Sequence, residues 1–189
     1  MKFQYISWEE IQDHCFKFSK KIIKEKIKFD RIICISRGGL VISRILSDFL
    51  KLPISNFTIV SYASVGNSGQ PKIVEKLSVD IKGESVLLVD EITDKGTTLK
   101  VAYDYLKPLN PQKIITFTPI IKPWSNPLPD FWQLKTNKWV VFSYDVRETI
   151  DDLKKIYKKE GKTLKDLKKE IQKLNFNNTQ SKYFLDKKD

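Results

Sequence analysis

Cysteine, histidine and long apolar runs are scarce in this chain of 189 residues, which has two cysteines and one histidine. Two cysteines are too few for a disulfide framework or a four-thiolate zinc site. A single histidine argues against histidine-based catalysis and against a His/Cys metal centre. We expect His14 to be structural and Cys34 to be a small core residue inside a strand.

No apolar run approaches the roughly 20 residues that span a bilayer. Trp8, Glu9 and Glu10 stand where a signal peptide would need an uninterrupted apolar stretch. With so few cysteines, the chain is typical of a reduced compartment. We therefore expect a cytoplasmic protein with no membrane partner.

The composition that is present indicates a folded, basic protein. Hydrophobic residues make up 41% and aromatic residues 12% of the chain, which excludes wholesale disorder. A formal net charge of +11 favours anionic partners such as phosphates, nucleotides or nucleic acid.

Short apolar runs alternate with helical patterns along the first three quarters of the chain. The predicted strands are residues 31–36, 57–61, 85–89, 113–121 and 139–144. Strands that are apolar on both faces and alternate with helices predict an α/β fold, with a mostly parallel sheet flanked by helices. In such folds ligands bind at the carboxyl ends of the strands.

The composition changes near residue 149, so we expect two parts, an α/β domain at 1–148 and a Lys-rich helical C-terminal extension at 149–189. Residues 151–189 contain 12 lysines and 7 acids. We predict two short helices there, followed by a disordered polar tail from Asn175. An apolar stripe must pack somewhere, within the extension or against a second subunit; it comprises Leu164, Leu167, Ile171 and Leu174.

The segment VLLVDEITDKGTTL, residues 86–99, has the residue types that a sugar phosphate needs. A helix that opens at Lys95–Thr98 offers backbone N–H groups and a positive dipole end to a phosphate. Asp90 and Glu91 would repel that phosphate unless they face hydroxyl groups or a divalent cation. A ribose 5-phosphate with a bound metal meets these demands. Alternatively, the acids merely follow a buried strand and Asp94 caps the helix.

The same segment resembles the phosphoribosyl diphosphate (PRPP) signature of type I phosphoribosyltransferases. Residues 35–40, ISRGGL, are similar to the pyrophosphate loop of the bacterial xanthine-guanine enzymes, within the 6-oxopurine branch that also includes hypoxanthine phosphoribosyltransferases. The resemblance covers roughly residues 5–147. The chain departs from the family pattern in its Asp-Glu pair and at Lys95 and Thr97 of the phosphate loop.

The resemblance implies a role for each matching residue. Asp90 and Glu91 hold the ribose hydroxyls, with Glu91 also near Mg²⁺. Asp94 lies near N7 of the purine as the general base. The implied PRPP- and nucleotide-binding residues are Arg37, Gly38, Asp90, Glu91, Asp94, Lys95, Gly96, Thr97 and Thr98, of which Arg37 and Gly38 hold the pyrophosphate.

A second group of residues is implied for the base. Lys122 follows a strand, where a lysine of the 6-oxopurine branch donates to the oxygen at C6. Trp139 and Asp145 match the spacing at which the ring stacks on the purine, while the backbone at Val140 and Asp145 read its C2 side. The alternatives are a solvated lysine and a core tryptophan. Residues 63–71 form either a lid over this site or an ordinary connection.

These observations predict an enzyme, a purine phosphoribosyltransferase of the glycosyltransferase class, that requires Mg²⁺. It converts PRPP and hypoxanthine, guanine or xanthine to the nucleoside monophosphate and pyrophosphate. The resemblance also implies a homodimer or homotetramer. One alternative is a PRPP- or nucleotide-sensing regulator that binds nucleic acid without catalysis. Another is a phosphatase with Asp90 or Asp94 as nucleophile, against which the missing DxD pattern argues.

Overall fold

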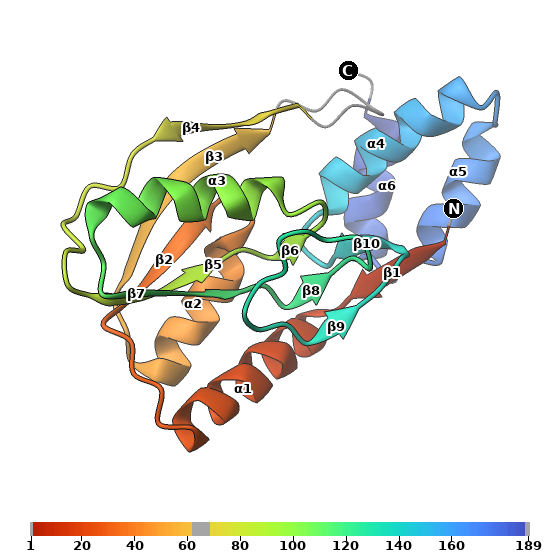
Figure 1. Cartoon of the computed structure of the whole chain (residues 1–189). Coiled ribbons are helices and arrows are strands. Elements are labelled where there is room, and N and C mark those ends of the chain that lie inside the picture. Colours follow the sequence, from red (N-terminus) through yellow and green to blue (C-terminus); the bar gives the residue numbers. More distant parts are fainter. Residues whose placement is uncertain (1, 62–68, 188–189) are drawn as a thin grey trace. The chain divides into compact units, whose positions relative to one another are not determined.

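The computed structural model of the chain describes residues 2–61 and 69–187, which divide into two compact units (Figure 1). The larger unit comprises the described residues 9–61 and 69–137, and the smaller comprises 2–8 and 138–187. The elements are β1 (Phe3–Ile6), α1 (Trp8–Lys24), β2 (Arg31–Ser36), α2 (Gly39–Leu50), β3 (Ile54–Ser61), β4 (Pro71–Glu75), β5 (Ser85–Val89), β6 (Ile92–Thr93), α3 (Thr97–Leu106), the 3-10 helix η1 (Lys107–Leu109), β7 (Lys113–Phe117), β8 (Ile120–Ile121), β9 (Leu134–Lys135), β10 (Trp139–Phe142), α4 (Val146–Lys159), α5 (Leu164–Gln172) and α6 (Asn178–Asp186).

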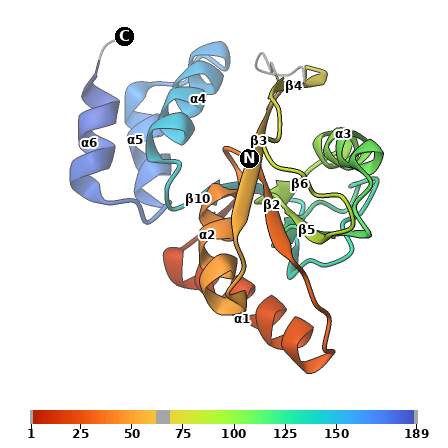
Figure 2. The same ribbon diagram turned by 90° about the vertical axis from the view of Figure 1, so that its left-hand side faces the viewer.

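A five-stranded sheet of order β4-β3-β2-β5-β7 forms the centre of the larger unit. Strands β3, β2, β5 and β7 run parallel to one another, and the edge strand β4 is antiparallel to β3. Helices cover both faces: α3 lies on one side of the sheet, and α1 and α2 lie on the other (Figure 2). The predicted α/β class with a mostly parallel, helix-flanked sheet is confirmed.

The alternation of side chains along the strands explains why both faces are covered. Ile33 of β2 and Val86 and Leu88 of β5 are buried in one cluster with Leu99 and Leu106 of α3. The intervening residues point to the opposite face, because successive side chains of a strand alternate. They are equally buried: Ile32, Cys34, Leu87 and Val89 are all 0% exposed.

The parallel register brings two loops together at the carboxyl edge of the sheet. Cys34 of β2 lies beside Val89 of β5, so the residues after both strands emerge next to one another. The loop after β2 carries Arg37 and Gly38, and the loop after β5 carries Asp90 and Glu91. Two segments more than 50 positions apart therefore meet where the sequence predicts a ligand.

A small parallel sheet of order β6-β8-β9 continues this edge. The predicted strand 113–121 is interrupted at Thr118 and Pro119, which separate β7 from β8. The break lets β8 leave the main sheet and pair with β6, as Ile92 with Ile120 and Thr93 with Ile121. As a result, the loop after β5 is tied to the segment that follows Ile121.

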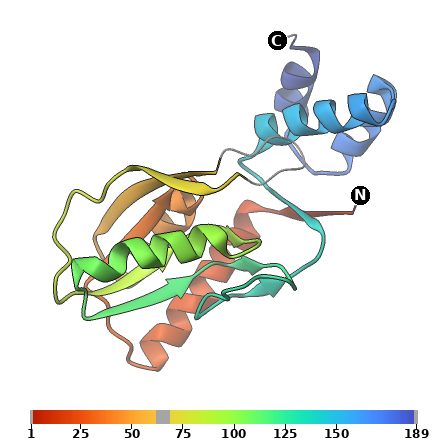
Figure 3. The ribbon, with the colours of Figure 1, turned by 45° about the horizontal axis from the view of Figure 1, so that its top comes forward.

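The smaller unit combines the parallel pair β1-β10 with three helices, α4 to α6, which lie together (Figure 3). The predicted C-terminal helical appendage is confirmed, but the predicted disordered tail from Asn175 is wrong. Asn177 caps α6, because its side-chain oxygen accepts from the N–H groups of Thr179 and Gln180. At the other end the Lys154 ammonium donates to the carbonyls of Phe184 and Lys187.

The apolar stripe of the extension packs inside its own unit. Leu167, Ile171 and Leu174 are at most 3% exposed and share a core with Ile150 and Leu153 of α4. Leu164, by contrast, is 67% exposed and lies at the N-terminus of α5. Three of the four stripe residues therefore need no second subunit to cover them.

This packing predicts a difference between two truncations in α5. Ile171→Ala removes buried methyl groups and should lower the free energy of unfolding by about 2–4 kcal/mol. Leu164→Ala, its matched control, should change it by less than about 0.5 kcal/mol. Both are measured by urea unfolding. A loss for Leu164→Ala that grew with protein concentration would instead place the stripe in a subunit interface.

Candidate active site

The two loops at the sheet edge enclose a cavity of about 320 Å³. Its lining residues are Ile35, Ser36, Arg37, Gly38, Ile59, Gly69, Asp90, Glu91, Ile92, Thr93, Asp94, Lys95, Gly96, Thr97, Thr98 and Leu99. All nine predicted PRPP- and nucleotide-binding residues are among them. Of the predicted lid, residues 63–68 lie outside the described residues.

Glycine is required where the loop after β2 approaches the acid pair. A Cβ at Gly38 would lie 2.6 Å from Oδ1 of Asp90 and 3.0 Å from the side chain of Glu91. A Cβ at Gly39 would lie 2.5 Å from the carbonyl oxygen of Val89. The peptide bond between Ser36 and Arg37 is cis. The Arg-Gly-Gly sequence thus allows the two loops to touch.

Asp90 and Glu91 are two partly buried carboxyl groups beside each other. The removal of water raises the pKa of Asp90 to about 8, and the negative charge of Glu91 adds to this increase. The Glu91 backbone N–H donates to Oδ1 of Asp90 over 2.9 Å. This hydrogen bond lowers the pKa of Asp90, but by less than the other two effects raise it. The pair therefore favours a ligand that brings positive charge or hydroxyl donors.

The N-terminus of α3 supplies the opposite electrostatic character in the same cavity. Gly96 precedes α3 in the left-handed conformation, with φ of 86°, and no side chain caps the helix there. The first turn of α3 has no acidic residue. Backbone N–H groups at Thr97 and Thr98 are thus available to an anion. The Thr97 side chain is exposed to solvent.

The segment after β8 forms hydrogen bonds to the backbone of the predicted phosphate loop, residues 93–98. The backbone N–H groups of Lys122 and Asn126 donate to the carbonyls of Thr93 and Lys95 over 3.1 and 3.2 Å. The Ser125 hydroxyl lies 2.6 and 2.7 Å from the carbonyls of Thr93 and Asp94. Any Cβ at Gly96 would lie 2.4 Å from the Asn126 carbonyl group. The segment after β8 therefore holds the phosphate loop at several points along its backbone.

Lys122 is buried, with 6% exposure, and is not part of the cavity lining. Burial lowers the pKa of its ammonium group, while the Asp94 carboxylate acts to raise it. The lysine thus interacts electrostatically with the predicted general base. A solvated surface lysine, the alternative that the sequence left open, does not fit this burial.

Trp124 also belongs to this region and was not predicted from the sequence. Its indole Nε1–H donates to Oδ1 of Asp94 over 2.7 Å. The prolines at 123, 127 and 129 indicate a loop here, and an indole next to the candidate lysine is the only signal that the sequence offers.

The remaining predicted base-binding residues belong to the smaller unit. Trp139 begins β10 opposite Phe3 and is 45% exposed, so it is not a core tryptophan. Val140 lies opposite Gln4 in the same pair of strands. Asp145 precedes α4, and its side chain makes no capping hydrogen bond to that helix. Their part in recognising a base stays a prediction.

The cysteines do not offer a nucleophile. Both are buried, and burial raises the pKa of the Cys15 thiol to about 12 and that of Cys34 to about 11. Because the thiolate is the reactive form, both thiols are inert at neutral pH. The prediction that Cys34 is a core residue is confirmed.

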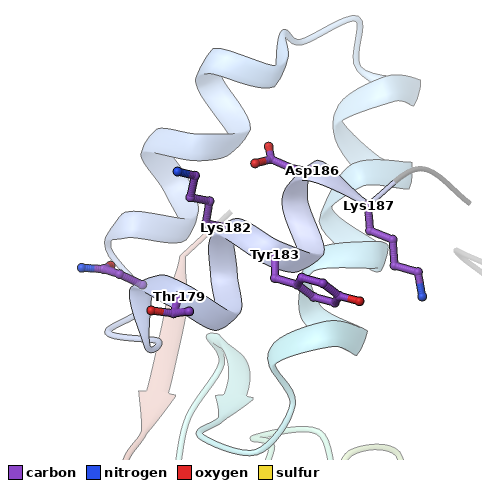
Figure 4. Close-up of a pocket in the computed structure, with 6 residues that line it drawn as sticks. Thr179, Lys182, Tyr183, Asp186 and Lys187 are labelled. Carbon is purple, nitrogen blue, oxygen red and sulfur yellow. The ribbon is translucent and has the colours of Figure 1, made fainter.

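A larger hollow, of about 680 Å³, lies along α6 in the smaller unit (Figure 4). Its lining residues, such as Lys182, Tyr183 and Asp186, are all exposed and come from this one helix. Among the described residues that line it, this hollow lacks a pair of adjacent acids like Asp90 and Glu91. The cavity at the sheet edge, which has such a pair beside a helix N-terminus, is therefore the better candidate. Within the described part of the chain, no helix is both long and apolar enough to cross a membrane.

Comparisons with known proteins agree with this geometry. The family model described as "Phosphoribosyl transferase domain" matches residues 7–149. A xanthine-guanine phosphoribosyltransferase of Gluconobacter oxydans is 25% identical over 144 residues, which are 74% of this chain and 83% of that protein.

Solved structures are similar as well. The purine phosphoribosyltransferase from Pyrococcus horikoshii is 30% identical, with a TM-score of 0.68 over 76% of this chain and 94% of that one. A Helicobacter pylori xanthine-guanine-hypoxanthine phosphoribosyltransferase shares the fold, with 21% identity and a TM-score of 0.65 over 81% and 99% of the two chains.

The raised pKa of Asp90 predicts a pH-dependent stability. Between the ordinary value of 3.8 and about 8, the folded state holds a proton that the unfolded state has released, so stability falls as pH rises. Asp90→Asn should raise the free energy of unfolding by about 1–3 kcal/mol at pH 9 and by much less at pH 4. Urea unfolding without divalent cations measures this.

The matched control is Asp48→Asn, which alters an exposed carboxylate of α2. It should change the free energy of unfolding by less than about 0.5 kcal/mol at both pH values. An equal gain for Asp90→Asn at pH 4 and pH 9 would show that Asp90 is ionised normally.

Proposed function

Because the chain belongs to the phosphoribosyl transferase domain family, a family of enzymes of the glycosyltransferase class, we propose that it transfers ribose 5-phosphate from PRPP to a 6-oxopurine base. The observation that carries this proposal is the cavity at the sheet edge. It combines two adjacent acids, of which Asp90 has a raised pKa, with an uncapped helix N-terminus and an Arg-Gly loop. These three features match the diol, the 5-phosphate and the pyrophosphate of PRPP.

Each part of PRPP has a chemical counterpart in the cavity. The ribose hydroxyls donate to Asp90 and Glu91. The 5-phosphate accepts hydrogen bonds from the backbone and hydroxyls of residues 95–98, and the dipole of α3 favours its charge. The Arg37 guanidinium and the Gly38 N–H hold the pyrophosphate and offset the charge that it gains on leaving.

The residues present suit a bound Mg²⁺. Among the described residues, no three His, Cys, Asp or Glu side chains are grouped as a complete metal site. Mg²⁺ is commonly held by one or two carboxylates together with substrate oxygens, and the acid pair provides that number. Glu91 is the proposed ligand. The ion would neutralise charge on the departing pyrophosphate.

Asp94 is the proposed general base, which accepts the proton from N7 of the purine as the base attacks the ribose. Lys122 is the proposed donor to the oxygen at C6, and it would reject adenine, whose amino group cannot accept that bond. Trp139 stacks on the purine in this scheme, while the Val140 backbone and Asp145 read its C2 side. The relatives that act on xanthine, guanine or hypoxanthine support this choice of base.

The division of the chain and its assembly are also proposals. Residues 1–148 would contain the transferase, with residues 149–189 as a helical extension. A homodimer or homotetramer is proposed on the family resemblance alone. The apolar stripe of the extension does not support it, because most of the stripe is buried within the chain.

A turnover panel tests the proposal. The protein is incubated with PRPP, Mg²⁺ and hypoxanthine, guanine, xanthine or adenine, and nucleotide and pyrophosphate are quantified. We expect both products in equal amounts from at least one 6-oxopurine, and at least tenfold less from adenine. Asp94→Asn should lower kcat by about a hundredfold or more. Asp104→Asn, on the exposed face of α3, is the matched control.

The outcomes distinguish the candidate functions. PRPP binding without nucleotide formation from any base would contradict the enzyme and favour the sensing alternative. Equal turnover of adenine and hypoxanthine would contradict the role of Lys122 while leaving the transferase in place.

A further inference from the structure

Trp124 combines high exposure with a specific polar contact. The side chain is 53% exposed, so packing alone does not account for an indole at this position. Its Nε1–H donates to Oδ1 of Asp94 over 2.7 Å, which is a short hydrogen bond to a carboxylate. The exposed aromatic ring is thus directed at the proposed general base.

Other contacts of this segment hold the backbone of the phosphate loop. Lys122, Ser125 and Asn126 bond to the carbonyls of residues 93–95. Those bonds fix the backbone at Asp94 and make no contact with its carboxylate. The indole of Trp124 is a direct hydrogen-bond partner of the Asp94 carboxylate.

The geometry of the carboxylate suits a base that must stay in place. Because Oδ1 accepts from the indole, Oδ2 is the oxygen that we assign to a ligand in the cavity that Asp94 lines. The Lys122 ammonium lies 6.0 Å from the centroid of the same ring, at the limit of a cation–π contact. One indole therefore connects the two groups assigned to N7 and to the C6 oxygen.

We propose that Trp124 is a positioning residue for the reaction, which holds the Asp94 carboxylate so that its second oxygen meets the proton on N7 of the purine. The role rests on the proposed function. It predicts an effect on the chemical step rather than on PRPP binding, since proximity and orientation of a reacting group act on kcat.

The test compares Trp124→Phe with Trp132→Phe. Phenylalanine keeps an aromatic face for Lys122 and removes only the N–H donor. Trp132 lies in the same connection between β8 and β9, is 40% exposed and, within the described chain, makes no hydrogen bond through its indole. We expect Trp124→Phe to lower kcat at least tenfold, with the KM for PRPP within twofold of wild type, and Trp132→Phe to match wild type.

A double-mutant cycle separates positioning from a general structural effect. In the Asp94→Asn background, where no carboxylate remains to be positioned, Trp124→Phe should change kcat by less than twofold. A loss of tenfold or more in both backgrounds would overturn the proposal, because the indole would then act on something other than Asp94.

Other outcomes would also overturn it. Equal kcat for Trp124→Phe and wild type would show that the hydrogen bond has no part in the reaction. A lower KM for the base at unchanged kcat would show that the indole competes with the purine. A wild-type protein that forms no nucleotide from any base refutes the proposed function itself and, with it, this role.

Discussion

The structure of the site depends on two adjacent carboxyl groups held at the end of a buried strand. β5 is apolar on both faces and places Asp90 and Glu91 at the sheet edge, where burial raises the pKa of Asp90. The neighbouring loop can approach only because it has glycine at Gly38, where any side chain would overlap Asp90. The acid pair lies in the same cavity as the positive end of α3. A ligand with a diol at one end and an anion at the other can bind both parts, because its hydroxyls donate to the acids and its anion accepts from the N-terminus of α3.

The second constraint is the bracing of the phosphate loop by the segment that follows β8. The short pair of β6 with β8 begins this bracing, and the bonds from Lys122, Ser125 and Asn126 continue it. Because the same segment carries Lys122 and Trp124, the proposed C6 donor and the partner of Asp94 are fixed relative to the loop assigned to the phosphate. The proposed catalytic step requires this, since a base at N7 must be aligned with a sugar held elsewhere.

Much of the fold and of the proposed PRPP site follows from local sequence. The β5 run, the acids after it and the Arg-Gly-Gly turn are contiguous patterns, and parallel register alone brings them together. The contact of Trp124 with Asp94 joins residues 30 positions apart through a loop of irregular backbone, which no periodicity reveals. The tail after Asn175 is polar in sequence, yet Asn177 caps a helix there. The Lys154 ammonium donates to the Phe184 carbonyl in the last turn of that helix. Both features depend on partners distant in the sequence. The smaller unit carries Trp139 and Asp145, whose proposed roles rest on the family resemblance.

The most direct test of the central claim is a calorimetric titration of PRPP with Mg²⁺ into the wild-type protein and into an Asp90→Asn/Glu91→Gln variant. The account predicts saturable binding to wild type and an affinity at least a hundredfold weaker in the variant, because the diol and the cation lose their carboxylate partners. Equal affinity in the two proteins would show that the acid pair does not receive the sugar.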